Sequence, residues 1–332
     1  MKALAGNVLA ASALAALAWA AYGADFMLGQ SALIATYAIA GLGVVVVVGQ
    51  TGMIALGQAA LVGLGAYVET LLALRGVSVL LSLPAAVLAG ALGGWLASLP
   101  ARRLDGLHFG ISTLAFALIV EEALVRAQPW TQGSAGLAVP VLSLGAWRAD
   151  AVAAQAAISL AALLLALLFC ARLLHSRIGR AWRALREDEV AAAACGIEAG
   201  GARTLAFACG GALSGLAGAL YAHWIGFITP EQFGLMFSFE LLMLAFIGGT
   251  RRLAGAFWGA VVIIAIPPAI ALLRAWLAGE HLAPGGVELM AFGLVIVAVV
   301  LLRPQGIAGE HPLRFGRRAR RESPPSAIPR PR

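Results

Sequence analysis

Ionisable side chains that lie close enough in sequence to act together are concentrated between Ser176 and Ile197. Four arginines are followed directly by three acids: Arg177, Arg180, Arg183, Arg186, Glu187, Asp188 and Glu189. Guanidinium and carboxylate groups at this density form hydrogen-bonded ion pairs with a complementary surface, which is the chemistry of recognition rather than of catalysis. The plainer interpretation is that the arginines anchor the cytoplasmic end of a preceding membrane helix while the acids keep the loop solvated.

Apolar residues in the same segment follow a helical period. Ile178, Ala181, Trp182 and Leu185 are spaced at i, i+3, i+4 and i+7, and Gly196 is a typical C-terminal stop. The pattern predicts one short amphipathic helix outside the bilayer. Its charge order, with arginines first and acids last, opposes the preference of the helix dipole, so helix stability does not account for that order. We interpret the segment as a helix offered to a partner protein, with the apolar stripe as its anchor.

The residues that usually carry catalysis or bind metals are scattered along the chain. Five histidines, at positions 108, 175, 223, 281 and 311, have no metal-site spacing, and Cys170, Cys195 and Cys209 are expected to be free thiols. Lys2 is the only lysine, which excludes a phosphate-binding loop, because that loop needs a lysine after its second glycine. We expect no enzyme activity, cofactor or metal in this chain, so another chain must bind any ATP.

The composition is that of a protein embedded in a membrane. Of the 332 residues, 61% are hydrophobic and 12% are charged, against about 25% charged in soluble proteins, and the mean hydropathy is +0.91. Forty glycines indicate helices that pack closely through small residues. The predicted fold class is therefore an all-α polytopic membrane protein.

About ten transmembrane helices are expected, from stretches of roughly 20 apolar residues. They cover residues 3–22, 28–48, 53–74, 77–99, 108–126, 151–174, 202–221, 235–249, 254–273 and 287–302. We expect the first to be a retained helix rather than a signal peptide, although the run from Ala18 to Asp25 could pass for a cleavage region. The expected domains are a membrane domain over 1–308, with the cytoplasmic helix 176–197 inside it, and a disordered basic tail over 309–332.

Basic residues orient the expected spans across the membrane. With the N-terminus inside, Arg75, Arg126, Arg148 and Arg274 lie outside, and the rest of the 23 basic residues lie inside or at the inner ends of spans. Both termini and the helix at 176–197 are therefore expected to be cytoplasmic. Attraction to the lipid bilayer explains the net charge of +7, with no nucleic acid as a partner.

Seven stretches, in order, resemble the branched-chain amino-acid ABC transporter permeases, in their LivM-like branch. The longest and most specific runs from Gly179 to Ala192 and continues at Gly196-Ile197. The others are residues 57–67, 105–116, 131–137, 216–221, 247–249 with 255–259, and 303–307. The resemblance covers roughly residues 28–308. The chain departs from the family at Ala55, Gln58 and Arg177, where the family usually has serine, histidine and proline.

The resemblance implies a permease subunit of an ATP-driven importer in a bacterial inner membrane. Its partners would be a second homologous permease subunit, two ATP-binding subunits that use ATP and magnesium, and a periplasmic solute-binding protein. The helix at 176–197 would then be a coupling helix that seats in a cleft of the ATPase. The residues expected to couple to the ATPase are Gly179, Arg180, Arg183, Arg186, Glu187, Asp188 and Gly196.

Polar residues within the expected spans are candidates for the substrate pathway, because an amino-acid zwitterion needs a counter-charge or oriented dipoles. They are Gln58, Tyr67, Ser112, Thr113 and Glu240. Interhelical hydrogen bonding is the plainer role for these groups, and a broken or pore-lining third span, which also carries Glu69, is the functional one. His223 is expected at the membrane interface.

The transported solute remains open at this stage. Branched-chain amino acids are implied most directly, and urea, short amides or another small solute of the same family are compatible. An ion-coupled secondary transporter is a further alternative, but the acids lie mainly near span ends rather than in mid-membrane pairs. Neither that alternative nor a membrane enzyme explains the segment at 176–197.

Overall fold

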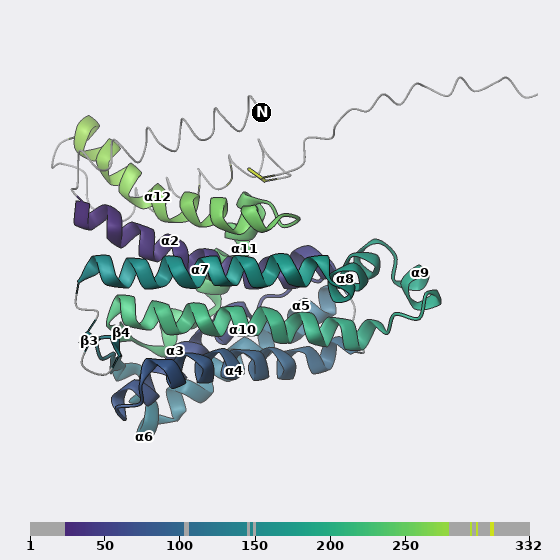
Figure 1. Ribbon diagram of the computed structural model, residues 1–332, viewed down its shortest axis with the longest axis horizontal. Helices are drawn as coiled ribbons and strands as arrows, with labels where there is room; N and C mark the ends of the chain where they lie inside the picture. The colour runs from purple at the N-terminus through teal and green to yellow at the C-terminus, as the bar shows by residue number, and fades with distance from the viewer. Residues whose placement is uncertain are drawn as a thin grey trace, which may run out of the picture.

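Helix α10 (Ala199–Ile225) runs through the middle of the protein and packs against α4, α3 and α2 (Figure 1). The computed structural model describes residues 24–102, 106–144, 147–148, 151–278, 293, 297 and 306–308. The other long helices are α2 (Ala24–Val44), α3 (Gln58–Leu74), α4 (Val79–Ser98), α5 (Gly106–Arg126), α7 (Val152–His175), α11 (Leu235–Gly248) and α12 (Leu253–Ala278). Helix α2 continues as a π-helical turn, η1 (Val45–Gly49), and α12 packs on α11 and α2.

Short elements gather at the two ends of the bundle. One end holds α8 (Arg177–Glu187) and α9 (Glu189–Ala194), together with η2 (Leu99–Arg102). The opposite end, marked by β3 and β4 in Figure 1, holds α6 (Gln128–Thr131), η3 (Gly133–Ala135), β1 (Leu137–Ala138), β2 (Ser143–Leu144), β3 (Trp147–Arg148), β4 (Phe227–Ile228) and η4 (Pro230–Phe233). Strand β1 pairs antiparallel with β4, and β2 with β3. We refer to these as the α8 end and the β4 end.

The mostly helical architecture, with four short strands outside the long helices of the described residues, agrees with the predicted helical membrane fold. Within the described residues, six helical segments are long and apolar enough to cross a membrane: 25–49, 79–98, 108–126, 152–175, 199–225 and 230–248. Helix α3 and the first part of α12 are shorter apolar helices. The expected spans at 3–22 and 287–302 and the tail at 309–332 lie outside the described residues, as does most of the run considered as a cleavage region.

The third expected span begins later than predicted. Residues 52–57 are not helical, and α3 starts at Gln58 instead of Met53. Side chains of other helices satisfy the backbone there: the Leu56 amide donates to Thr113 Oγ1 (3.0 Å) and the Ala59 amide to Ser238 Oγ (3.2 Å). Irregular backbone within a membrane protein is tolerated where protein groups replace the missing helical hydrogen bonds. The predicted broken helix is thus a break before α3, not within it.

Glycines bring α3, α4 and α10 into backbone contact. An added Cβ at Gly215 of α10 would collide with the Ala86 carbonyl oxygen and lie 3.1 Å from the Gly90 Cα, both on α4. An added Cβ at Gly65 of α3 would lie 2.5 Å from the Gly215 Cα. Close packing through small residues is therefore what holds these three helices together, as the composition predicted.

Candidate functional site

The charged segment after α7 forms two helices rather than the single helix that we predicted. Asp188 interrupts the run with an extended backbone (φ −158°, ψ 114°) and caps α9, because its Oδ1 accepts the amides of Val190 (2.9 Å) and Ala191 (3.0 Å). Asp188 and Glu189 therefore lie at the start of α9, where the helix dipole favours acids, whereas Glu187 is the last residue of α8. The division into two helices thus accounts for two of the three acids but not for the arginines at the start of α8. Gly196 ends α9 with φ +80°, as expected.

The apolar stripe of α8 is buried in its own chain, so the prediction that it anchors a partner protein is wrong. Trp182 is fully buried, and its Nε1 donates to the Ala202 carbonyl of α10 at 2.8 Å. Leu185 is also buried, and Ile178 packs against the same core. A helical stripe indicates that one face of a helix is covered, and here the cover is the bundle itself.

All three predicted coupling arginines bind backbone carbonyls of the bundle. Arg180 donates to His175 O (3.1 Å) and Arg183 to Leu174 O (3.2 Å), both in the last turn of α7. Arg186 donates to Gly49 O at the end of η1 (2.6 Å), and its side chain lies against Gly52. These bonds satisfy carbonyls that a helix end leaves open. Together with Trp182, they fix α8 to α7, α10 and η1.

Two other members of the predicted coupling set have different positions. Gly179 is buried against α7, since an added Cβ would lie 2.5 Å from the Leu174 Cα. Glu187 is exposed, as is Val190, which has 81% of its surface open. Helix α9 is held to α10 by the ion pair between Glu189 and Arg203 (2.7 Å). The outer face around Glu187 and Val190 is therefore a part of this segment that a partner can reach.

The predicted pathway residues near the α8 end are tied to the irregular segment at 52–57. Thr113 is buried and bonds both the Leu56 amide and the Gly110 carbonyl, while Ser112 beside it is half-buried. Gln58 opens α3, is 2% exposed and accepts a hydrogen bond from Ser214 at 3.2 Å. Its Nε2 has no partner among the described residues. The structure thus brings Gln58 and Thr113 to one region, next to the break before α3.

Tyr67 and Glu240 lie toward the β4 end, apart from that region. Tyr67 is 2% exposed and stacks edge-on against Phe233 at 6.2 Å, with no hydrogen-bond partner for its hydroxyl in the described part of the chain. Glu240 is half-buried on α11 and accepts a hydrogen bond from Tyr37 of α2. The five predicted pathway residues therefore form two groups, one toward each end of the bundle.

A buried polar cluster that we did not predict joins α3, α4, α10 and the loop after β1 at the β4 end. Glu69 is fully buried, and its Oε1 accepts from Ser82 Oγ (2.7 Å) and contacts His223 Nε2 at 3.0 Å. His223 Nδ1 lies 3.0 Å from the Pro140 carbonyl and must donate to it, because a carbonyl only accepts. A second proton is then required between Nε2 and Oε1. His223 is thus buried within the protein in the last turn of α10, and its expected place at the membrane interface stays a prediction.

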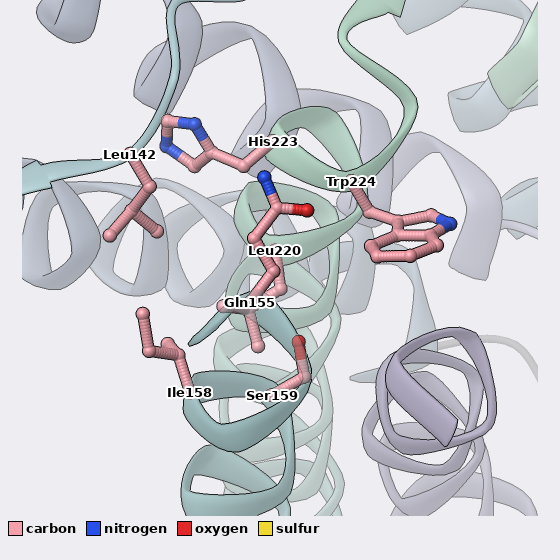
Figure 2. Close-up of a pocket in the computed structure, with 7 residues that line it drawn as sticks. All are labelled: Leu142, Gln155, Ile158, Ser159, Leu220, His223 and Trp224. Atoms are coloured by element: carbon pink, nitrogen blue, oxygen red, sulfur yellow. The ribbon is translucent and has the colours of Figure 1, made fainter. Parts of the chain in front are cut away.

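A cavity of about 10 Å³ adjoins this cluster between α7 and α10 (Figure 2). Its polar lining consists of Gln155, Ser159 and His223, and the rest is apolar. That volume admits about one water molecule, so the cavity does not hold an amino acid. Within the described ranges, no three His, Cys, Asp or Glu side chains converge to hold a metal ion.

Glu69→Leu is expected to lower the free energy of unfolding by about 3 to 5 kcal/mol, since it leaves His223 and Ser82 buried without their partner. Adding His223→Leu should recover part of that loss, because the second substitution removes the unpaired ring. Thermal unfolding of the purified chain in detergent measures both variants. If Glu69→Leu lowered the free energy of unfolding by less than about 1 kcal/mol, the contact between Glu69 and His223 would not be important for stability.

Comparisons with known proteins match the chain to one family and to several relatives. Residues 26–302 match the family described as branched-chain amino acid transport system / permease component. The chain is 30% identical over 296 residues to the high-affinity branched-chain amino acid transport system permease protein LivM of Salmonella typhimurium, covering 82% of this chain and 67% of that one. It is also 29% identical to LivH of the same organism, covering 82% and 91%. No solved structure matches the chain.

Proposed function

Since this chain belongs to the family of branched-chain amino acid transport permease components, we propose that it is the membrane-spanning subunit of an ATP-driven importer of amino acids, most directly the branched-chain ones. The observation that carries this proposal is the extent of the family match. It runs over residues 26–302 and so includes the helical bundle together with α8 and α9.

The partners that we propose are a second permease, two ATP-binding subunits and a periplasmic solute-binding protein. The similarity to both LivM and LivH supports a second, related permease chain. The absence of any lysine after Lys2 supports a separate ATPase, which would bind ATP and magnesium. In this proposal the outer face around Glu187, at the end of α8, and Val190 of α9 contacts that ATPase.

The proposed setting is a bacterial inner membrane, with the α8 end and both termini in the cytoplasm. The distribution of basic residues supports this orientation, as does the gathering of arginines on α8. We retain about ten spans for the membrane domain over 1–308, followed by a basic tail over 309–332. The β4 end would then face the solute-binding protein.

In this proposal, movement of the ATPase reaches the substrate pathway through the contacts that α8 makes with the rest of the chain. Trp182 ties α8 to the start of α10, and Arg186 ties it to Gly49, just before the irregular segment at 52–57. That segment is bonded in turn to α5 through Thr113, and the first turn of α3 is bonded to α11 through Ser238. Displacing α8 would therefore move α10 and the break before α3 together. Each nucleotide state must favour one arrangement through differential contact at α8 and α9.

Co-purification tests the assembly directly. The tagged wild-type chain, extracted from its native membranes, is expected to bring with it an ATPase and a second permease, identified by mass spectrometry. The reconstituted assembly should import L-leucine only when ATP and the solute-binding protein are present. Recovery of the chain alone, or only with copies of itself, would instead favour a secondary transporter.

A further inference from the structure

Glu240 is an acidic side chain within an apolar helix. It lies about 8 Å along α11 from Leu235, at 1.5 Å per residue. No arginine or histidine in the described part of the chain pairs with it, and the hydroxyl of Tyr37 donates a hydrogen bond to it. An ionisable group inside a membrane span that has no protein counter-ion indicates a functional site.

Three aromatic rings from three helices pack together next to Glu240. Tyr37 of α2, Tyr221 of α10 and Phe237 of α11 form a triangle, with ring centroids 5.7, 5.9 and 6.4 Å apart. Glu240 is hydrogen-bonded to Tyr37 and interacts electrostatically with Tyr221. Phe237 precedes it by one turn on the same side of α11. Phe233 continues the aromatic cluster toward the β4 end.

This combination of groups matches an organic ammonium ion. A carboxylate offers the counter-charge, and aromatic faces attract a cation through their quadrupoles. A hard metal ion would need several oxygen ligands, and in the described part of the chain no three His, Cys, Asp or Glu side chains gather here. The apolar rings also suit an aliphatic side chain. A neutral solute such as urea or a short amide has no charge for Glu240 to balance.

The carboxylate can be reached from one side of α11. Met236 and Met243, which neighbour Glu240 on the helix surface, are 83% and 40% exposed. Glu240 thus lies at the border between the buried face of α11 and an exposed apolar face. A carboxylate turned toward lipid would be costly, so this border is better suited to a pathway between this chain and a second permease.

We propose that Glu240, with Tyr37, Tyr221 and Phe237, binds the α-ammonium group of the transported amino acid as it passes through the chain. This inference rests on the proposed function, which it narrows to solutes that carry an ammonium group. The position toward the β4 end makes it an early contact for a substrate that arrives from the solute-binding protein.

Uptake by the reconstituted assembly distinguishes binding through the charge of Glu240 from a purely structural role of this side chain. Glu240→Gln is expected to lower L-leucine uptake at least about tenfold, with normal amounts of assembly, because the amide removes the charge but still accepts the Tyr37 hydrogen bond. Glu240→Asp should retain more uptake than Glu240→Gln. Tyr37→Phe, the control, keeps the carboxylate and the ring and should have a smaller effect. Uptake by Glu240→Gln at the wild-type rate would overturn the inference.

Direct binding decides the inference even if the wild-type assembly imports no leucine, a result that would contradict the proposed function alone. The full chain in lipid nanodiscs is titrated with isopentylamine, which is leucine without its carboxylate, and with isocaproate, which is leucine without its ammonium group. Intrinsic fluorescence should report binding of the amine to wild type and not to Glu240→Gln. Absence of amine binding to wild type, equal binding to the variant, or a preference for isocaproate would overturn the site.

Discussion

Replacing Gly215 by valine is expected to prevent the chain from folding in the membrane. The valine Cβ would have to occupy the space of the Ala86 carbonyl oxygen, and its methyl groups would press on Gly90 of α4. Backbone atoms cannot rotate away as a flexible side chain can, so α10 would have to move away from α4, and the packing of Gly65 of α3 on Gly215 leaves little room for that movement. We expect the free energy of unfolding to fall by more than about 3 kcal/mol, since overpacking alone typically costs about 1 to 3 kcal/mol.

Gly110→Ala is the matched control for this prediction. Gly110 also lies within a long helix, but an added Cβ there would be 3.5 Å from its nearest neighbour, an ordinary contact. Gly110→Ala should leave the free energy of unfolding unchanged or raise it by up to about 1 kcal/mol. Size-exclusion chromatography of fluorescent fusions extracted from membranes measures both. A monodisperse Gly215→Val peak of wild-type height would show that the three helices do not depend on this contact.

Long apolar stretches were the part of the fold that the sequence predicted best. Twenty apolar residues in a row permit little other than a spanning helix, so α4, α5 and α7 lie within about two residues of their expected positions. Residues 53–57 were predicted as helix because they are about as apolar as the helix that follows them. Their irregular backbone depends on Thr113, far away in sequence, which hydropathy along the chain does not register.

The α8 region shows which part of a site periodicity can predict. The spacing of Trp182 and Leu185 correctly indicated a covered helical face, but spacing does not identify the covering surface, which here is α10. The break at Asp188 had a readable signal, since aspartate before a run of alanines is a typical N-cap. The bond between Glu69 and His223 joins positions far apart in the chain, and neither residue has a local pattern that points to the other.

Two variants on opposite faces of the α8–α9 segment are expected to separate binding of the ATPase from coupling to it. Glu187→Lys with Val190→Asp changes only exposed side chains, so the chain should fold but lose the co-purifying ATPase. Trp182→Ala removes the buried ring and its bond to Ala202, at a local cost of about 3 to 5 kcal/mol. The ATPase should remain bound in that variant while uptake of L-leucine falls at least about tenfold.

The distinction follows from the contacts of α8. The ATPase can reach Glu187 and Val190, whereas Trp182 has no exposed surface and faces α10. Arg177→Ala is the control, because Arg177 is exposed at the start of α8, away from both groups, and it should leave ATPase recovery and uptake unchanged. If Trp182→Ala released the ATPase as completely as the double variant does, the packing of Trp182 on α10 would be needed for ATPase binding and not for coupling alone. If Trp182→Ala instead kept normal uptake, movement of the ATPase would have to reach α10 and the break before α3 by a route other than the contact between Trp182 and α10.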